Sequence, residues 1–240
     1  MCDNERVHRA VNAVVCYSNT GECRRIADYL SQRLNYRLED IFGAGREYGD
    51  AVLVFPVHCQ NVPREVAEFL SNLKVSNLTV IAVYGKMCHG NVLYEIAKKY
   101  KHNIVAGAYV PAKHTYIDEP RFCNFDGLDP VVKKVQSPCA VKIPKSYKNP
   151  FANLFTGLRS RMGVRIIKDG NCDGCGKCRT YCPRRAIADG KTNRRCIRCL
   201  GCVALCPKQA LSFKPSPLMS AYLKKKKRDE IIIYPAECGF

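Results

Sequence analysis

The feature that most constrains the fold is a cysteine pattern that occurs twice toward the carboxyl end of the chain. The pattern C-x2-C-x2-C-x3-C-P begins at residue 172 and again at residue 196. It uses half of the 16 cysteines: Cys172, Cys175, Cys178 and Cys182 in the first copy, and Cys196, Cys199, Cys202 and Cys206 in the second. A repeat with the same internal spacing indicates one small structural unit that is built twice.

The spacing suits an iron–sulfur cluster better than the other common uses of cysteine. A [4Fe–4S] cluster takes thiolates at four corners, and two intervening residues let successive cysteines wrap one cube. Gly174, Gly176 and Gly201 permit the tight turns that this wrapping needs. Zinc sites usually show two C-x2-C pairs separated by a longer loop, without the C-x3-C-P ending. Disulfides would instead imply an exported protein.

Residues 165–213 resemble a bacterial-type two-cluster ferredoxin along nearly their whole length. In ferredoxins of this pattern, the fourth cysteine of each run binds the cluster of the other run. The resemblance therefore implies two [4Fe–4S] clusters with crossed ligands. One cluster would be held by Cys172, Cys175, Cys178 and Cys206, and the other by Cys196, Cys199, Cys202 and Cys182.

The amino-terminal residues and the cysteine content bear on the cellular compartment. Residues 1–15 mix acidic, polar and basic side chains before a short apolar run, which is unlike a signal peptide. No stretch reaches the length of about 18 apolar residues that a membrane helix needs. Sixteen cysteines without an export signal favour a reducing compartment. Because exposed clusters decay in oxygen, we expect a cytoplasmic protein of an anaerobe.

The residues before the cysteine repeat predict an α/β domain. Continuous apolar, β-branched runs are typical of parallel strands buried on both faces. Such runs occur at residues 11–18, 50–57, 78–85 and 103–110, and residues 36–40 fit a shorter strand. Segments with helical spacing lie between them, at residues 20–34, 63–73 and 91–100. This alternation predicts a doubly wound parallel sheet.

Three loops that follow predicted strands carry polar side chains. The first consists of Ser18, Asn19, Thr20, Gly21, Glu22 and Cys23; the second contains Pro56, Val57, His58 and Cys59; the third contains Tyr84, Gly85, Lys86, His89, Gly90 and Asn91. The first loop opens a helix, and backbone N–H groups and short hydroxyls at a helix N-terminus favour an anion. It contains neither the G-x-G-x-x-G motif of dinucleotide sites nor the G-K-[ST] motif of P-loops. It is therefore a candidate site for a phosphate group.

Residues 10–110 resemble flavodoxins at these three loops. The first loop is similar to the S/T-x-T-G-x-T loop that takes the single phosphate of FMN, with Cys23 where threonine is common. The third resembles the T-Y-G-x-x-x-G-N loop beside the isoalloxazine ring, with Val83 in place of threonine. The resemblance implies FMN and a five-stranded sheet of order 2-1-3-4-5, with FMN at the carboxyl ends of the strands.

Some loop residues have two readings. His58 stands where flavodoxins usually place an aromatic side chain, and His58 and His89 are either flavin contacts or ordinary loop histidines. Cys59 and Cys88 lie in the same loops, where either could contact the ring or pack as a small apolar side chain.

The sequence predicts three parts: residues 1–163, a flavodoxin-like FMN-binding domain with a connector; residues 164–213, a small α+β two-cluster ferredoxin domain; and residues 214–240, a basic tail. Residues 128–135 and 151–162 compete for the last helix of the sheet, and we expect both to contribute to the core. Residues 137–150 are rich in proline and lysine, which predicts an exposed connector. In the tail, residues 231–234 are apolar and are expected to dock, because an exposed strand of this kind would aggregate.

The net charge of the chain indicates which class of partner it binds. The chain has 39 Lys and Arg against 21 Asp and Glu, a formal net charge of +18. A basic surface fits nucleic acid. However, the six arginines that adjoin the cluster ligands could raise cluster potential or attract an acidic partner; they are Arg179, Arg184, Arg185, Arg194, Arg195 and Arg198. We expect an acidic redox protein (a ferredoxin, flavodoxin or oxidoreductase) as the partner, with nucleic acid as the alternative.

The whole chain resembles the flavodoxin–ferredoxin fusion proteins of anaerobes. This resemblance implies an electron-transfer protein that passes electrons between FMN and two [4Fe–4S] clusters, coupling two-electron to one-electron carriers. Two alternatives remain. The chain could be an FMN-dependent reductase of a small substrate supplied through the clusters, or a basic redox-sensing protein that binds nucleic acid.

Overall fold

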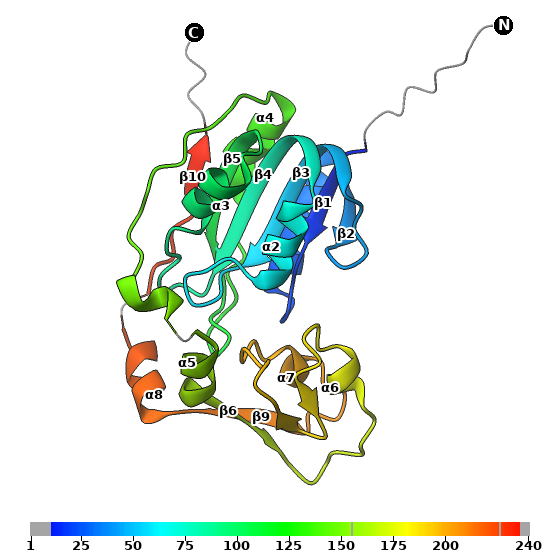
Figure 1. Ribbon diagram of the computed structural model, residues 1–240, viewed down its shortest axis with the longest axis vertical. Coiled ribbons are helices and arrows are strands. Elements are labelled where there is room, and N and C mark those ends of the chain that lie inside the picture. Colours follow the sequence, from blue (N-terminus) through cyan, green and yellow to red (C-terminus); the bar gives the residue numbers. More distant parts are fainter. Residues whose placement is uncertain (1–10, 155, 226, 236–240) are drawn as a thin grey trace, which may run out of the picture.

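A computed structural model describes residues 11–154, 156–225 and 227–235 of the chain (Figure 1). The larger part is a six-stranded sheet with helices on both faces, and the smaller, cysteine-rich part lies at the end of the sheet where the parallel strands finish. Among the described residues, no helix has the length and apolar character needed to cross a membrane.

The sheet has the order β10-β5-β4-β3-β1-β2. Its parallel strands are β1 (Ala13–Cys16), β2 (Arg37–Asp40), β3 (Glu47–Pro56), β4 (Lys74–Tyr84) and β5 (Ile104–Pro111). The sixth, β10 (Ile232–Pro235), pairs antiparallel with β5. All four residues of β1 and all eight of β5 are buried, which explains why these segments are uninterrupted apolar runs.

Four helices cover the two faces of this sheet. They are α1 (Glu22–Leu34), α2 (Arg64–Ser71), α3 (Val92–Tyr100) and α4 (Asp129–Gln136). The apolar residues of α2 and α3 join one core cluster, and those of α1 and α4 join the other, so two helices cover each face. This arrangement, with the order 2-1-3-4-5 for the parallel strands, is that of flavodoxin-like folds.

The cysteine-rich part is framed by two antiparallel strands, β6 (Val164–Lys168) and β9 (Leu211–Pro215). Between them lie α6 (Lys177–Thr180), β7 (Ile187–Ala188), β8 (Lys191–Thr192) and α7 (Gly201–Ala204). The remaining elements are η1 (Asp126–Leu128), η2 (Pro150–Asn153), α5 (Thr156–Gly163) and α8 (Pro217–Leu223). Each copy of the cysteine pattern places its third cysteine in a one-turn helix, α6 or α7. The two copies are therefore similar local structures.

The predicted doubly wound sheet is confirmed, but the predicted number of five strands is wrong. The chain returns from the cysteine-rich part and adds β10 beside β5. Both faces of this strand meet apolar residues: Ile232 and Tyr234 pack on one core cluster, and Ile231 and Ile233 on the other. The expectation that residues 231–234 dock is thus confirmed, and docking covers the edge that β5 would otherwise expose.

Of two expectations for the segment between the sheet and the repeat, one is wrong and the other holds only in part. Residues 151–162 do not form a core helix, because Phe151 is 68% exposed and Met162 71% exposed. The helix that completes the sheet is α4, and a 3₁₀ turn beginning at Pro150 breaks the longer apolar stripe into two short pieces.

Residues 137–150 are an exposed connector only in part, because eight of the fourteen are exposed but five are half-buried and Ile143 is buried. Ile143 is only 7% exposed and packs over Gly107 in β5, and the Val141 N–H donates to the Ile104 carbonyl at 2.8 Å. We call residues 141–149 the strap. Their proline and lysine content reflects irregular backbone, which need not be exposed when its polar groups find partners.

Candidate functional site

The structure gathers the eight cysteines of the repeat around two cavities. A cavity of about 350 Å³, which we call the outer cavity, is lined by Cys172, Cys175, Cys178 and Cys206. A cavity of about 510 Å³, the inner cavity, is lined by Cys182, Cys196, Cys199 and Cys202. Each cavity therefore combines three cysteines of one copy with the fourth cysteine of the other copy.

The donor set is suited to a cluster. All eight of these cysteines are free thiols. Four of them line each cavity, which is the number of ligands that a [4Fe–4S] cluster takes at its corners. Among the described residues, no three His, Cys, Asp or Glu side chains converge on a point where a single ion could bind. Burial raises the pKa of Cys199 to about 11, and burial with the neighbouring thiols raises the pKa of Cys202 to about 12, so a bound group would have to displace their protons.

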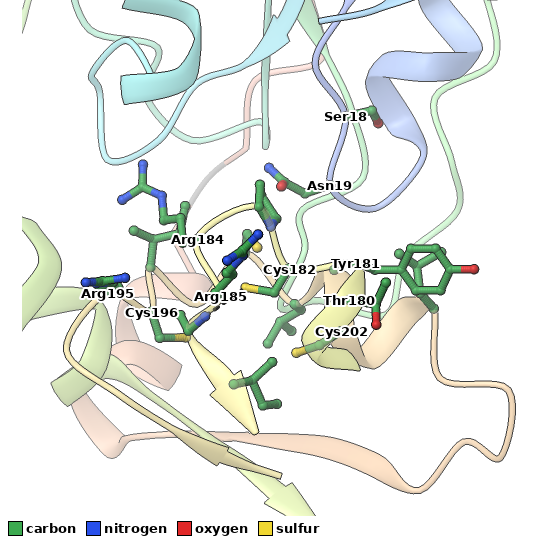
Figure 2. A pocket seen from close by; sticks show the side chains of 18 of the residues that line it. Ser18, Asn19, Thr180, Tyr181, Cys182, Arg184, Arg185, Arg195, Cys196 and Cys202 are labelled. Atoms are coloured by element: carbon green, nitrogen blue, oxygen red, sulfur yellow. Dashed lines mark hydrogen bonds between the residues drawn. The ribbon is translucent and has the colours of Figure 1, made fainter. Parts of the chain in front are cut away.

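The two cavities differ in their surroundings. Every residue that lines the outer cavity belongs to the cysteine-rich part. The inner cavity is also lined by Tyr17, Ser18 and Asn19 from the loop after β1 (Figure 2). Close to this loop, Gly201 at the start of α7 leaves no room for a side chain, because a Cβ atom would lie 2.9 Å from the Asn19 carbonyl oxygen. The inner cavity is thus formed where the two parts of the molecule meet.

An ion pair also joins the two parts beside the inner cavity. Arg184 donates from Nε and Nη2 to both carboxylate oxygens of Glu65 in α2, at 2.8 and 3.1 Å. Burial is the largest single influence on Glu65 and opposes ionisation, but the hydrogen bond and charge of Arg184 together with a backbone hydrogen bond outweigh it and lower the pKa of Glu65. A two-point contact of this kind fixes orientation as well as distance.

Two ring side chains lie close to this ion pair. The hydroxyl of Tyr17 is buried and has no hydrogen-bond partner among the described residues. Burial, with contributions from Glu65 and Cys199, raises the pKa of Tyr17. Burial and the charge of Arg184 lower the pKa of His58 to about 4, although Glu65 opposes this shift. His58 is therefore neutral at pH 7, and its Nε2 lies 3.3 Å from the Asn19 amide nitrogen.

The first predicted loop has the features of an anion site. Gly21, at φ 92°, is the N-cap of α1, and no side chain caps this helix. Ser18 Oγ accepts the Gly21 N–H at 3.2 Å, and a Cβ at Gly21 would meet nothing within 4 Å. The N–H groups of the first turn of α1 therefore face open space beside the Ser18 hydroxyl. Cys23 is 3% exposed and packs in the core, so its thiol points away from this space.

The second and third loops are strained. His58 and Asn61 form a tight two-residue turn through mutual backbone hydrogen bonds, with Cys59 at φ 50° and Gln60 at φ 64°. Lys86 in the third loop has φ 58°. Left-handed backbone at residues other than glycine has an energetic cost and is concentrated at functional sites.

Several predicted contact residues of the third loop are turned into the protein. The Tyr84 hydroxyl donates to the Glu230 carbonyl at 3.0 Å, and Lys86 pairs with Asp229. His89 is 5% exposed and stacks on Tyr109 with ring centres 3.8 Å apart. These positions favour the reading of His89 as an ordinary loop histidine.

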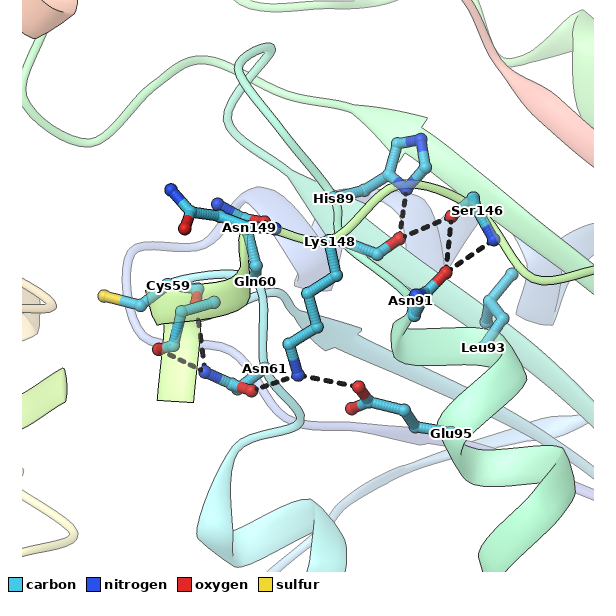
Figure 3. Close-up of polar contacts among 12 residues, drawn as sticks. Cys59, Gln60, Asn61, His89, Asn91, Leu93, Glu95, Ser146, Lys148 and Asn149 are labelled. Carbon is cyan, nitrogen blue, oxygen red and sulfur yellow. Dashed lines mark hydrogen bonds and ion pairs between the residues drawn. The ribbon is translucent and has the colours of Figure 1, made fainter. Parts of the chain in front are cut away.

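The strap connects the second and third loops, which nothing in the sequence indicated (Figure 3). Lys148 Nζ donates to Asn61 at 2.7 Å and to Glu95 at 2.6 Å. Ser146 donates from its backbone N–H to the Asn91 side chain and from its hydroxyl to the Gly90 carbonyl. The loops also touch directly, because a Cβ at Gly90 would lie 2.8 Å from Gln60. A lysine and a serine in an irregular segment carry no periodic pattern from which these contacts could be predicted.

The structure thus places the predicted loop residues in two groups. Ser18 and Asn19 line the inner cavity, with His58 beside them, whereas Tyr84, Lys86 and His89 are held within the protein. Pro56 and Val57 are half-buried, and Cys59 is exposed with its Sγ 3.5 Å from Ser160 Oγ.

Comparisons with known proteins add little to this description. No family model matches the chain, and no curated protein matches it. Among solved structures, the chain is similar to a protein from Bacteroides uniformis that is described, provisionally, as a flavoprotein. The identity is 15% and the TM-score 0.39, and the match covers 43% of this chain and 92% of that chain. At this level of similarity, the fold assignment rests on the strand order and not on the match.

Proposed function

We propose that the chain is an electron-transfer protein that holds two [4Fe–4S] clusters and one FMN and passes electrons between them. The observation that carries the proposal is the crossed arrangement of the cysteines, with three from one copy and one from the other around each cavity. Eight free thiols in two sets of four match the ligand requirement of two such clusters.

The loop after β1 supports the proposal that FMN binds beside the inner cavity. The N-terminus of α1 lacks a side-chain cap, and Ser18 and Thr20 supply hydroxyls beside it. A singly charged or doubly charged phosphate is stabilised in such a place by N–H groups and the helix dipole. The buried hydroxyl of Tyr17 and the strained turn at Cys59 and Gln60 follow β1 and β3, at the carboxyl end of the sheet where doubly wound folds bind ligands.

The residues of this chain would position the cofactors and exclude water. FMN exchanges electrons singly or in pairs and each cluster exchanges one, so the assembled protein would connect carriers of the two kinds. The close approach of Gly201 to Asn19 and the Glu65–Arg184 pair hold the inner cavity against the loop after β1. This contact would shorten the distance that an electron travels between the two parts of the molecule.

Cofactor content tests the proposal. Anaerobically purified protein is expected to contain about eight iron and eight sulfide per chain, because two four-iron clusters require this number. The extracted flavin should be FMN, at one per chain. Gly21→Asp should abolish flavin binding, since it adds a negative charge where the phosphate would lie, whereas Gly170→Asp, in open space on the other part, should not. Stoichiometric zinc, or protein without flavin after reconstitution, would contradict the proposal.

Paired cysteine variants test the crossed ligand sets. Cys206→Ser should remove the outer cluster, so about four iron per chain should remain. Adding Cys175→Ser should cost no further iron, because Cys175 lines the same cavity, whereas adding Cys199→Ser should remove the rest. Cys123→Ser, at an exposed cysteine that lines neither cavity, is the control. The opposite pairing of losses would show that the ligands are not crossed.

A further inference from the structure

The rim of the inner cavity has an unusual composition for a protein surface. Eight residues that line this cavity are exposed, and one of them, Asp40, is acidic. Five of the eight are large apolar side chains or arginines: Phe42, Tyr181, Arg185, Arg195 and Leu205. We call them the rim patch. Phe42 is 61% exposed, Tyr181 55% and Leu205 49%. Large apolar and aromatic side chains with arginine are the residues enriched in protein interfaces. Three of them around one redox cavity are more than scattered surface apolar residues.

The rim of the outer cavity is different. Its basic residues are Lys177, Arg179 and Lys208, and two acidic residues, Asp173 and Asp189, lie among them. Lys208 lies 3.8 Å from Asp173, so part of this charge is offset. None of the large exposed apolar side chains in the described residues lines the outer cavity. Of the two cavities, the inner one therefore has the rim that better fits a protein partner.

Four of the six arginines of the repeat lie outside the rim patch, and two of these four, Arg198 and Arg184, are held by partners within the protein. Arg198 is 8% exposed and donates to the Val164 carbonyl at 2.8 Å and to the Thr192 hydroxyl at 2.7 Å. Arg184 is paired with Glu65. Their charges are used within the protein. Arg185 and Arg195 are exposed and form no ion pair among the described residues, so they remain available to an acidic partner.

We propose that the rim patch is the docking surface for an acidic one-electron carrier protein; this rests on the proposed function. Arginines beside exposed apolar residues match a partner whose redox centre is ringed by carboxylates. A second copy of this chain is disfavoured because each carries a formal charge of +18. Each docking event transfers one electron: the reduced carrier loses it and the cluster of the inner cavity gains it, and no bond forms or breaks.

Binding to a defined probe tests the proposal. The probe is an acidic two-cluster ferredoxin, and the dissociation constant is measured by calorimetry on the iron-loaded protein. Binding should weaken steeply between about 0.01 and 0.1 M salt, since the screening length falls from about 30 to about 10 Å. Arg185→Glu with Arg195→Glu should weaken it about tenfold or more at low salt, chiefly through association rate. Tyr181→Ser with Leu205→Ser should weaken it at both salt concentrations.

The matched control reverses two lysines elsewhere. Lys98→Glu with Lys99→Glu changes the net charge by the same amount at exposed positions on α3, away from the cysteine-rich part. This variant should change the dissociation constant by less than about twofold. Iron content is measured for every variant. If the unmodified protein contained no iron, that result would contradict the proposed function and not the docking proposal.

Three results would overturn the docking proposal. They are failure of the unmodified, iron-loaded protein to bind the ferredoxin, equal weakening by the α3 control, and indifference to the rim variants. A random-sequence DNA duplex serves as a competing probe. If it binds tightly and the rim reversals abolish that binding while ferredoxin binding is unchanged, the surface is a nucleic-acid site and the proposal is wrong.

Discussion

His114 is an uncharged side chain that stabilises the interface between the sheet and the cysteine-rich part. Its Nδ1 accepts the Tyr116 N–H at 3.1 Å, and the Tyr116 hydroxyl donates to the Arg198 carbonyl at 2.6 Å. Gly85 packs against the same ring, since a Cβ there would lie 2.7 Å from it. The imidazole must be neutral at Nδ1 to accept this hydrogen bond. Burial lowers the pKa of His114 to about 4, which Glu119 opposes and Lys227 assists.

This lowered pKa predicts acid sensitivity. The unfolded chain binds a proton at the ordinary histidine pKa of 6.5, whereas the folded protein binds it only at about 4. Stability is therefore complete above pH 6.5 and is lost as the pH falls from 6.5 toward 4. Between pH 7 and 5, His114 should contribute a loss of about 1–2 kcal/mol. His114→Asn keeps an acceptor but does not titrate, so its thermal midpoint should fall less over this range. If the thermal midpoints of the unmodified protein and of His114→Asn fell by the same amount, His114 would not be the cause of the acid sensitivity.

At the scale of elements, β10 joins the sheet through contacts that lie far away in the chain. It pairs with β5 from Ile232 opposite Tyr109 to Pro235 opposite Ala106. The segment just before it covers the third loop, through the Glu230 carbonyl and Asp229. The carboxyl-terminal segment thus ties the cysteine-rich part back to the sheet and to one of the loops of the site.

A charged side chain on β10 should lower the stability of the whole sheet domain. Ile233 packs in the core cluster formed with α1 and α4, so Ile233→Asp would place a carboxylate among apolar groups. We expect a loss of about 2–4 kcal/mol in stability. The measurement is the thermal midpoint by circular dichroism. Leu218→Asp, at a position 83% exposed in α8, should have no comparable effect. Similar midpoints for the two variants would show that β10 contributes little to the sheet.

At the scale of the whole molecule, the contact between the two parts is concentrated at the inner cavity. It combines a backbone approach at Gly201, the Glu65–Arg184 pair and the hydrogen bond from Tyr116 to Arg198. Because the inner cavity alone is shared between the parts, a change at this contact should affect one cysteine set and spare the other.

Gly201→Ala tests this asymmetry. The added methyl group would lie 2.9 Å from the Asn19 carbonyl oxygen, so α7 and the loop after β1 must move apart. Hydrogen exchange at residues 18–22 should become faster, and the spectrum and reduction potential of the inner cluster should change. The outer cluster should not change. Gly170→Ala, where a Cβ meets nothing within 4 Å, is the control. If both clusters responded equally, the contact would not be specific to the inner cavity.

Local patterns in the sequence predicted much of this protein. The apolar runs predicted β1, β3, β4 and β5, because a strand buried on both faces has nowhere to place a polar side chain. Helical spacing predicted α1 to α3, because each of these helices packs one apolar face on the sheet and leaves the other face to polar residues. The resemblance of the repeat to two-cluster ferredoxins implied two crossed sets of four cysteines, and the cysteines line two cavities in those sets; that they bind clusters stays a prediction.

Only the tertiary structure decided which polar residues are buried and what they contact. Nothing near Arg198 in sequence distinguishes it from Arg195, yet one is buried on the Val164 carbonyl and the other is exposed. Likewise, the strap is composed like an exposed connector, but Lys148 and Ser146 find partners on loops far away in the chain. A polar group can be buried wherever a distant segment supplies a hydrogen-bond partner. That supply depends on how the segments pack and leaves no periodicity in the sequence around the residue itself.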